Sequence, residues 1–246
     1  MSFIINSYRF IVDSFTNTKS LSSDGVDEWV DYGLISKLSN VSNCSISGWV
    51  EITSLSTSYY WASFEDTSNM LSLLYNSSVG EMWIQHKNTG NDSTYKLATG
   101  FSTSGWHHFT VVFDGSLADS SKIKLYLDGV LQTLTYVGSP KATTATITTK
   151  GFSTHARYDA AAFLTGSIDE VAVFDYSLTS GEVTSIYNSG CPNNLMALSD
   201  PKKPEHYYRM GDDDTYPTIT DVGATGTNDG TMTNMESGDI TTNTPC

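Results

Sequence analysis

The sequence contains few cysteines and few prolines. It has three cysteines and six prolines among 246 residues. Cys44, Cys191 and Cys246 lie far apart and form no Cys-x-x-Cys pair, which excludes the usual zinc and dithiol redox motifs. The spacing leaves two alternatives open: three free thiols, or a bridge between Cys191 and Cys246 with Cys44 free.

Positive charge is also scarce. Lys and Arg together number 13 against 27 Asp and Glu, which gives a formal net charge of −14. Binding to nucleic acid needs a basic surface that displaces counterions from phosphate, and binding to anionic lipid needs the same sign of charge. No apolar run approaches the roughly 18 residues of a membrane span. We therefore expect neither a nucleic-acid partner nor a membrane partner.

The first ten residues lack a continuous apolar stretch. Phe3, Ile4 and Ile5 are followed directly by the polar Asn6 and Ser7, where a signal peptide would continue its apolar region. We therefore expect a chain that is made in the cytoplasm of its host and is not exported through a secretory signal.

Helical periodicity is almost absent, and short alternating runs recur instead about every ten residues. The clearest predicted strand is Trp106–Asp114. Asp128-Gly129 lies between two such runs and predicts a tight hairpin. One helix is predicted at Ser180–Tyr187, capped by Thr179 or Ser180 and closing one end of the molecule.

About a dozen short antiparallel strands allow a sandwich, a barrel or a propeller. No repeat at the period of a propeller blade is visible, which favours an all-β, two-sheet antiparallel jelly-roll sandwich with one short helix.

Composition divides the chain into three parts: an N-terminal arm (residues 1–18), the sandwich (19–190) and an extended C-terminal tail (191–246). The tail is rich in Asp, Asn, Gly and Thr and is too poor in apolar residues to fold alone. Its predicted anchors are Tyr207, Tyr208, Met210, Ile219, Val222, Met232 and Met235. We expect these anchors to pack either on the chain's own sandwich or on a neighbouring subunit.

Several motifs, taken in order, resemble the laminin G-like branch of the concanavalin A-like lectin/glucanase jelly rolls. They are Leu21–Val30, Cys44–Val50, Gly105–Gly115, Leu125–Val130, and Gly166–Val171 followed by Leu178. The resemblance covers residues 19 to 190. It implies two sheets, one of them concave, with Trp49 and Trp106 as buried anchors of the core.

A tail placed after the sandwich is similar to the arrangement in laminin G-like proteins of tailed, especially marine, bacteriophages. Tyr207–Asp212 and Asp221–Met235 look like a segment that normally precedes the first strand of such modules. The resemblance implies a structural component of the virion.

Catalytic groups are not recognisable. Relatives that hydrolyse glycosides carry paired carboxylates on one strand face, and the Glu-x-Asp-x-x-Glu pattern is missing here. Asp169 and Glu170 are consecutive, so strand alternation predicts that they face opposite sides. The same reasoning separates His107 from His108, which we interpret as structural histidines. We therefore predict no catalytic residues and a chain that is not an enzyme.

Calcium is the metal that the composition favours, because oxygen ligands are abundant. The laminin G-like resemblance implies a calcium site at the rim of the sandwich formed by Asp24, Asp27 and Asp169. The run Asp212-Asp213-Asp214 lacks the spacing of an EF-hand loop and is interpreted as a solvated turn.

Aromatic residues that could stack on sugar rings lie in two clusters. The first is Tyr59-Tyr60-Trp61 and the second contains Trp83, Gln85 and His86. From these clusters we select Tyr60, Trp61, Trp83 and His86 as candidate glycan-binding residues. Alternation predicts that Tyr60 faces the side opposite to Tyr59 and Trp61.

The sequence therefore predicts a non-enzymatic virion structural protein of a tailed phage, a capsid decoration or fibre-type component on the virion surface. Its expected partners are other virion proteins or further copies of the chain, in a homo-oligomer, together with a host cell-surface glycan. The alternative is a free carbohydrate-binding lectin or adhesin.

Overall fold

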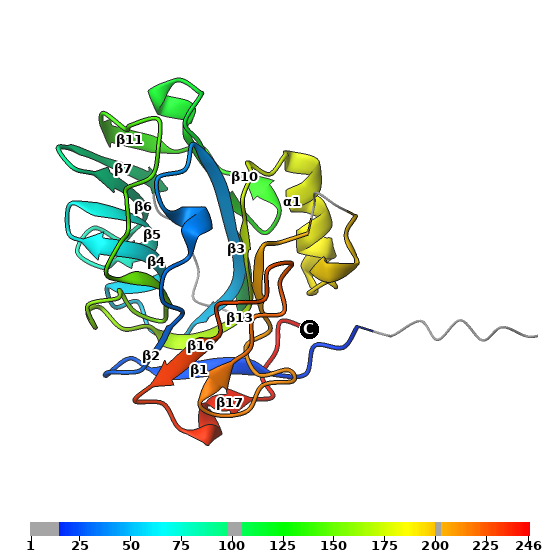
Figure 1. Cartoon of the computed structure of the whole chain (residues 1–246). Helices are drawn as coiled ribbons and strands as arrows, with labels where there is room; N and C mark the ends of the chain where they lie inside the picture. Colours follow the sequence, from blue (N-terminus) through cyan, green and yellow to red (C-terminus); the bar gives the residue numbers. More distant parts are fainter. Residues whose placement is uncertain (1–14, 98–104, 200–202) are drawn as a thin grey trace, which may run out of the picture.

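The computed structural model describes residues 15–97, 105–199 and 203–246. In this part of the chain, two antiparallel sheets pack face to face (Figure 1). The main core lies between them and contains large side chains such as Trp61, Phe109 and Tyr208. The predicted all-β, two-sheet jelly-roll sandwich is confirmed.

Eight strands form one sheet within the described residues. Their order is β10 (Val130–Leu131), β9 (Ile123–Leu127), β8 (Trp106–Asp114), β3 (Asn43–Ile52), β13 (Thr165–Phe174), β1 (Ser20–Asp24) and β17 (Ile240–Thr241), with β14 (His206–Tyr208) also paired to β13.

In the same described part of the chain, nine strands form the other sheet. Their order is β11 (Thr135–Gly138), β7 (Asn91–Leu97), β6 (Glu81–Asn88), β5 (Asn69–Asn76), β4 (Ser58–Asp66), β12 (Gly151–Thr154), β2 (Trp29–Asp31), β16 (Gly230–Thr233) and β15 (Thr218–Ile219). Short 3-10 turns occur at η1 (Ser36–Leu38), η2 (Asp119–Ser121), η3 (Asn188–Gly190), η4 (Leu195–Ala197) and η5 (Ser237–Asp239).

The strongest local predictions match the structure. β8 has the predicted limits, and β9 and β10 form the hairpin expected around Asp128-Gly129. Both turn residues have positive φ, 50° and 76°, as a two-residue turn of this type requires. The run after the turn is shorter than expected, because pairing with β9 ends at Leu131 and β11 then joins the other sheet.

The α-helix α1 (Ser180–Tyr187) also has the predicted limits. Thr179 and Glu182 form a reciprocal capping box at its N-terminus. The helix does not close an end of the sandwich, however. It covers the outer face of the eight-stranded sheet (Figure 1), where Val183 and Ile186 pack with Val112 of β8 and Phe174 of β13.

The two tryptophans expected in the core lie elsewhere. Trp49 is buried on the outer face of the eight-stranded sheet, where it stacks on Tyr187 at a ring-centroid distance of 5.7 Å. Trp106 is partly exposed. The expected core positions were wrong because the helical layer buries a second set of side chains on the outer face.

The C-terminal tail completes the chain's own sandwich. β14 and β17 pair with β13 and β1 of one sheet, and β16 pairs with β2 of the other. Of the predicted anchors, all but Val222 are buried; Val222 is 36% exposed. Of the predicted N-terminal arm, residues 1–14 lie outside the described residues.

Among the described residues, no helix has both the length and the apolar character needed to span a membrane.

Candidate functional site

The outer face of the nine-stranded sheet carries partly exposed aromatic and amide side chains, among them Trp29, Trp83 and Gln85, but not the full predicted set. A β-bulge in β4 explains the difference. Tyr59 pairs with Leu74 and Trp61 with Leu73, so two residues of β4 stand opposite one of β5. As a result Tyr60 and Trp61 both enter the main core, while Tyr59 faces the opposite side of the sheet, where it is also buried.

Tyr60 and Trp61 each have 0% exposure, so the prediction that they contact a glycan was wrong. His86 is equally buried, because it faces inward on β6 and stacks on Phe113. Burial lowers the pKa of His86 to about 4, and its Nε2 lies 3.1 Å from the carbonyl oxygen of Thr143. His86 is therefore a neutral core histidine.

Trp83 is the predicted glycan residue that remains partly exposed on the outer face. Its indole N–H donates to the Glu81 carboxylate at 2.7 Å, which fixes the orientation of the ring. The Lys96 ammonium lies over the ring, 4.9 Å from its centroid. Trp83 therefore offers an aromatic surface beside one anionic and one cationic group.

The middle of this face holds a chain of hydrogen bonds. Arg157 donates to the Tyr59 hydroxyl at 3.3 Å, and that hydroxyl donates to the Gln85 side-chain oxygen at 3.1 Å. Two further Arg157 nitrogens bind the two carboxylate oxygens of Asp159, at 2.7 and 2.9 Å. The guanidinium also lies over the rings of Tyr59 and Phe64. These contacts hold planar polar groups in fixed positions.

A second aromatic pair lies toward the other edge of the same face. The rings of Trp29 and Tyr158 meet edge to face at 5.3 Å, and both side chains are partly exposed. The Tyr158 hydroxyl donates to Asp31 at 3.0 Å. Burial, followed by the charge of Asp31, raises the pKa of Tyr158 to about 12, so the hydroxyl keeps its proton. Four strand spacings separate this pair from Trp83, or about 19 Å.

The loop that builds this face carries only weak local signals in the sequence. Arg157 and Tyr158 lie in a loop between β12 and β13, and they reach the sheet because the backbone N–H of Tyr59 donates to the carbonyl oxygen of Ala162 at 3.0 Å. The loop also contains Ala160 and Ala162 at positive φ, which alternation and propensity do not predict. Proximity of these residues to Trp29 and Tyr59 depends on tertiary pairing.

Asp169 and Glu170 were predicted to face opposite sides of the sheet, and the structure differs from this prediction as well. A second bulge, in β13, gives Glu170 a φ of 50° and shifts the register between Asp169 and Ala172. Ile168 and Val171 face the main core, so both carboxylates lie on the outer face of the eight-stranded sheet. Both are buried.

Their buried surroundings disfavour ionisation. Burial, and then the charge of Glu170, raises the pKa of Asp169 well above its usual value. Burial also raises the pKa of Glu170 to about 8, against the opposing effect of Arg209. Arg209 donates to Glu170 at 3.2 Å, and the Tyr207 hydroxyl donates to the same carboxyl group. Because both carboxyl groups are buried and already hydrogen-bonded, they cannot approach a glycosidic bond.

The three residues predicted to bind calcium do not meet. Asp24 and Asp27 are exposed, whereas Asp169 is buried and accepts a hydrogen bond from Asn17 at 2.7 Å. Asp24 pairs with Thr165, four residues and about 14 Å from Asp169 along β13. No group of three His, Cys, Asp or Glu able to hold a metal occurs among the described residues. This residue set does not fit a calcium ion.

His107 and His108 face opposite sides, as predicted. Trp49 pairs with His108 across the strands, and the two rings lie tilted to each other with centroids 5.0 Å apart on the outer face. His107 lies 2.8 Å from the Asp128 carboxylate, which also accepts the backbone N–H of His108. The pair therefore fastens the β9–β10 hairpin to β8.

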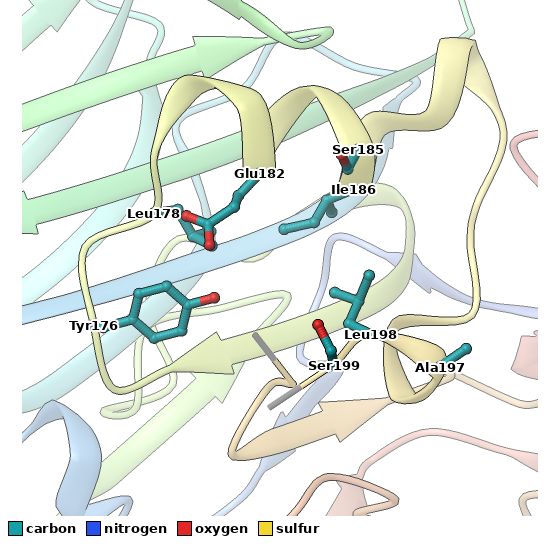
Figure 2. Close-up of a pocket in the computed structure, with 8 residues that line it drawn as sticks. All are labelled: Tyr176, Leu178, Glu182, Ser185, Ile186, Ala197, Leu198 and Ser199. Atoms are coloured by element: carbon teal, nitrogen blue, oxygen red, sulfur yellow. The ribbon is translucent and has the colours of Figure 1, made fainter. Parts of the chain in front are cut away.

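A pocket of about 350 Å³ lies between α1 and the η4 segment (Figure 2). Leu178, Ile186 and Leu198 form apolar walls, and Tyr176 and Glu182 supply polar groups. The Glu182 carboxylate already accepts the backbone N–H and hydroxyl of Thr179. The pocket therefore offers one aromatic ring, two serine hydroxyls (Ser185 and Ser199) and a carboxylate that is already bonded, whereas the outer face of the nine-stranded sheet offers several rings and charged groups.

Residues 24–184 match the family described as the concanavalin A-like lectin/glucanases superfamily, in its laminin G-like branch. The chain belongs to this family. The motifs that resembled laminin G-like jelly rolls lie in or near this range. Among curated proteins, none has a sequence that matches the chain.

Solved structures share the fold at low sequence identity. One is a protein from Bacteroides ovatus described as carbohydrate binding (14% identity, TM-score 0.59), with 90% of this chain and 60% of that chain covered. Another is domain 4 of AbnA, an extracellular GH43 arabinanase from Geobacillus stearothermophilus, in complex with arabinotriose (19%, TM-score 0.53, 68% and 76% covered). A third is the native heptameric SAP-like pentraxin of Limulus polyphemus (15%, TM-score 0.51, 70% and 82% covered).

Proposed function

We propose that this chain is a carbohydrate-binding module that holds a glycan on the outer face of the nine-stranded sheet. The observation that carries the proposal is the arrangement of aromatic groups. Trp83 and the Trp29–Tyr158 pair stand about 19 Å apart, and the Tyr59–Gln85–Arg157 hydrogen bonds lie between them. The family and the carbohydrate-binding descriptions of two structural neighbours support the same function.

The chemistry of this face suits a sugar chain. Sugar rings present C–H faces that pack on aromatic rings, and hydroxyl groups at their edges exchange hydrogen bonds with amides, carboxylates and guanidinium groups. Lys87, Lys96, Lys150 and Arg157 also lie on or above this face, in a chain whose formal net charge is −14. These cations stand beside the carboxylates of Glu81, Asp31 and Asp159, so the face offers a sugar groups of both signs for hydrogen bonding.

Binding without hydrolysis is part of the proposal. Asp169 and Glu170 are buried on the opposite sheet, where Asn17 donates to Asp169, and Arg209 and Tyr207 donate to Glu170. On the outer face of the nine-stranded sheet, Glu81 is bonded to the Trp83 indole and Asp31 to the Tyr158 hydroxyl. These carboxylates orient aromatic rings, which is a binding role.

The test is a glycan-array screen of the purified chain, followed by titration of the best polysaccharide. Trp83→Ala should weaken binding about tenfold or more, because it removes the aromatic surface on which a sugar stacks. Trp106→Ala is the matched control, since Trp106 is also partly exposed but lies on the other sheet. Equal loss in the two variants, or no glycan bound by the wild type, would rule the proposal out.

A structural component of an assembly, such as the surface of a virion, is the second proposal. The observation that favours it is the exposed apolar side chains on the edge strands β10 and β11, including Val130, Leu131 and Val137. Light scattering on the sample used for the array separates the two. A defined oligomer without glycan binding favours the structural role, and a monomer that binds a glycan favours the module.

A further inference from the structure

Two of the three cysteines meet although 54 residues separate them in sequence. Partial desolvation, and then the neighbouring Cys191 thiol, raises the pKa of the Cys246 thiol to about 11, so the two side chains lie close together. Cys191 is half-buried and Cys246 is exposed, while Cys44 is buried in the main core. The sequence allowed either free thiols or a Cys191–Cys246 bridge, and the fold brings this pair into contact.

Cys191 is held by the helical layer. It directly follows η3, which continues from α1. At the end of α1, Tyr187 stacks on Trp49 of β3 at 5.7 Å and lies near His108 of β8 at 5.9 Å. Asn193, two residues after Cys191, donates to the carbonyl oxygen of Ser185 at 3.2 Å. These contacts fix the position of Cys191 over the eight-stranded sheet.

Cys246 is held by a separate set of contacts made by Asn243. The Asn243 carbonyl oxygen accepts from Ser20 of β1 at 2.6 Å. Its side chain donates to Glu51 of β3 and accepts from Trp106 of β8. The last residues of the chain therefore lie across three strands of the eight-stranded sheet. Both cysteines are positioned before any bond joins them.

We propose that Cys191 and Cys246 form an intramolecular disulfide, by exchange with a small-molecule disulfide such as oxidised glutathione, that fastens the C-terminal tail to the helical layer. One cysteine thiolate attacks a sulfur of the reagent, and one glutathione thiolate leaves. The second cysteine thiolate then attacks the protein sulfur of the mixed disulfide and releases the second glutathione. The protein loses two electrons and two thiol protons, and the reagent is reduced to two thiols.

Because the two cysteines lie close together, the internal disulfide should form in preference to lasting glutathionylation of either cysteine. Trp49 and His108, which contact Tyr187, are neighbours of Glu51 and Trp106, which bind Asn243, on the same face of β3 and β8. Both cysteines are therefore anchored over one patch of the sheet. The bond would close the loop from residue 191 to residue 246, which contains β14, β15, β16 and β17. Cross-linking a loop of this length restricts the unfolded chain and stabilises the folded one.

The experiment compares the full chain after incubation with excess oxidised or reduced glutathione. The oxidised sample should lose the mass of two hydrogen atoms, and digestion should yield a peptide pair joined at Cys191 and Cys246. Its unfolding temperature should rise by about 5–10 °C relative to the reduced sample. Cys246→Ser should abolish both effects, and Cys44→Ala should keep the mass loss and the cross-linked peptide pair.

Cys191→Ser provides a second variant that must also abolish the cross-link. Two results would overturn the proposal. One is an oxidised protein that carries glutathione on Cys191 or Cys246 with no internal bond. The other is a cross-linked chain whose unfolding temperature equals that of the reduced chain. Neither result depends on whether the chain binds a glycan, so this proposal and the proposed function can fail separately.

Discussion

Glu170 illustrates how one residue in an unusual backbone conformation changes the chemistry of its neighbour. With φ at 50°, it places its carboxyl group beside that of Asp169 on the same face of the sheet. Ionisation of both members of an adjacent buried carboxyl pair is energetically unfavourable, and the pKa values of both groups are raised. Arg209 and Tyr207, both from the tail, are the partners of Glu170. The bulge thus joins the tail to the sandwich through a hydrogen-bonded carboxyl group.

We expect this group to make stability fall as pH rises. Between the unfolded pKa of Glu170, near 4.5, and its folded pKa of about 8, the folded state binds more protons than the unfolded state. Stability from this group is complete below pH 4.5 and is lost as pH rises to about 8. Glu170→Gln should flatten the decline in unfolding temperature between pH 6.5 and 9, measured by circular dichroism.

Other buried groups also influence how stability depends on pH. His86, His108 and His155 have pKa values lowered to about 4 by burial, so their contribution changes below pH 6.5. The pKa of Asp169 is raised together with that of Glu170, so the decline above pH 6.5 belongs to the buried pair, and Glu170→Gln removes the Glu170 share of it. Parallel curves for the wild type and Glu170→Gln would show that the carboxyl group does not titrate in the folded protein as described.

The hairpin between β9 and β10 shows how one element constrains another. Gly129 in the turn has a φ of 76°, and a Cβ placed there would lie 2.8 Å from the Tyr187 ring at the end of α1. Glycine is therefore required at position 129 for two reasons: the turn needs a positive φ, and the packed helix leaves no room for a Cβ atom. Asp128 on the other side of the turn binds His107 and the backbone of His108.

Gly129→Ala should consequently destabilise the protein more than an alanine in a free turn. Gly90, in the β6–β7 turn, has nearly the same φ, 79°, but nothing lies within 4 Å of its Cβ position. Gly90→Ala should cost about 1 kcal/mol for the backbone conformation alone. Gly129→Ala should cost about 1–3 kcal/mol more, because the Tyr187 ring must move. Urea denaturation of the two variants measures the difference, and equal costs would refute the contact.

At the scale of the whole molecule, the tail completes both sheets. The family match ends at residue 184, yet the next 62 residues supply β14 and β17 to one sheet and β15 and β16 to the other. Their buried side chains, such as Tyr208, Met210 and Met232, belong to the main core. The sandwich without its tail would expose open strand edges and part of the core to water.

Deletion of residues 205–246 should therefore leave a chain that is insoluble or unfolded. The measurement is size-exclusion chromatography with far-ultraviolet circular dichroism. Addition of a peptide covering residues 203–246 during refolding should restore soluble, folded protein, because the tail supplies strands and core side chains in trans. A truncated chain that stays monodisperse and unfolds at the wild-type temperature would contradict this role.

Much of the fold was predictable from local patterns. β8 and α1 were predicted at their observed limits and the β9–β10 turn at its observed position, because alternation, a capping box and an Asp-Gly turn act over a few neighbouring residues. The candidate site was less predictable: Trp83 was identified, while Tyr60, Trp61 and His86 proved to be buried. The partners Trp29, Arg157 and Tyr158 went unrecognised because they come from distant segments.

Composition, strand period and local motifs are encoded residue by residue, so they were enough to predict the sheet-rich architecture, the family and the acidic surface. The tertiary structure decided which side chains meet. Single-residue bulges in β4 and β13 reversed the faces of Tyr60 and Glu170, because one extra residue shifts a two-residue alternation by half a period. Contact between Cys191 and Cys246 likewise required the tail to cross the completed sheet, a long-range packing event that no local pattern encodes.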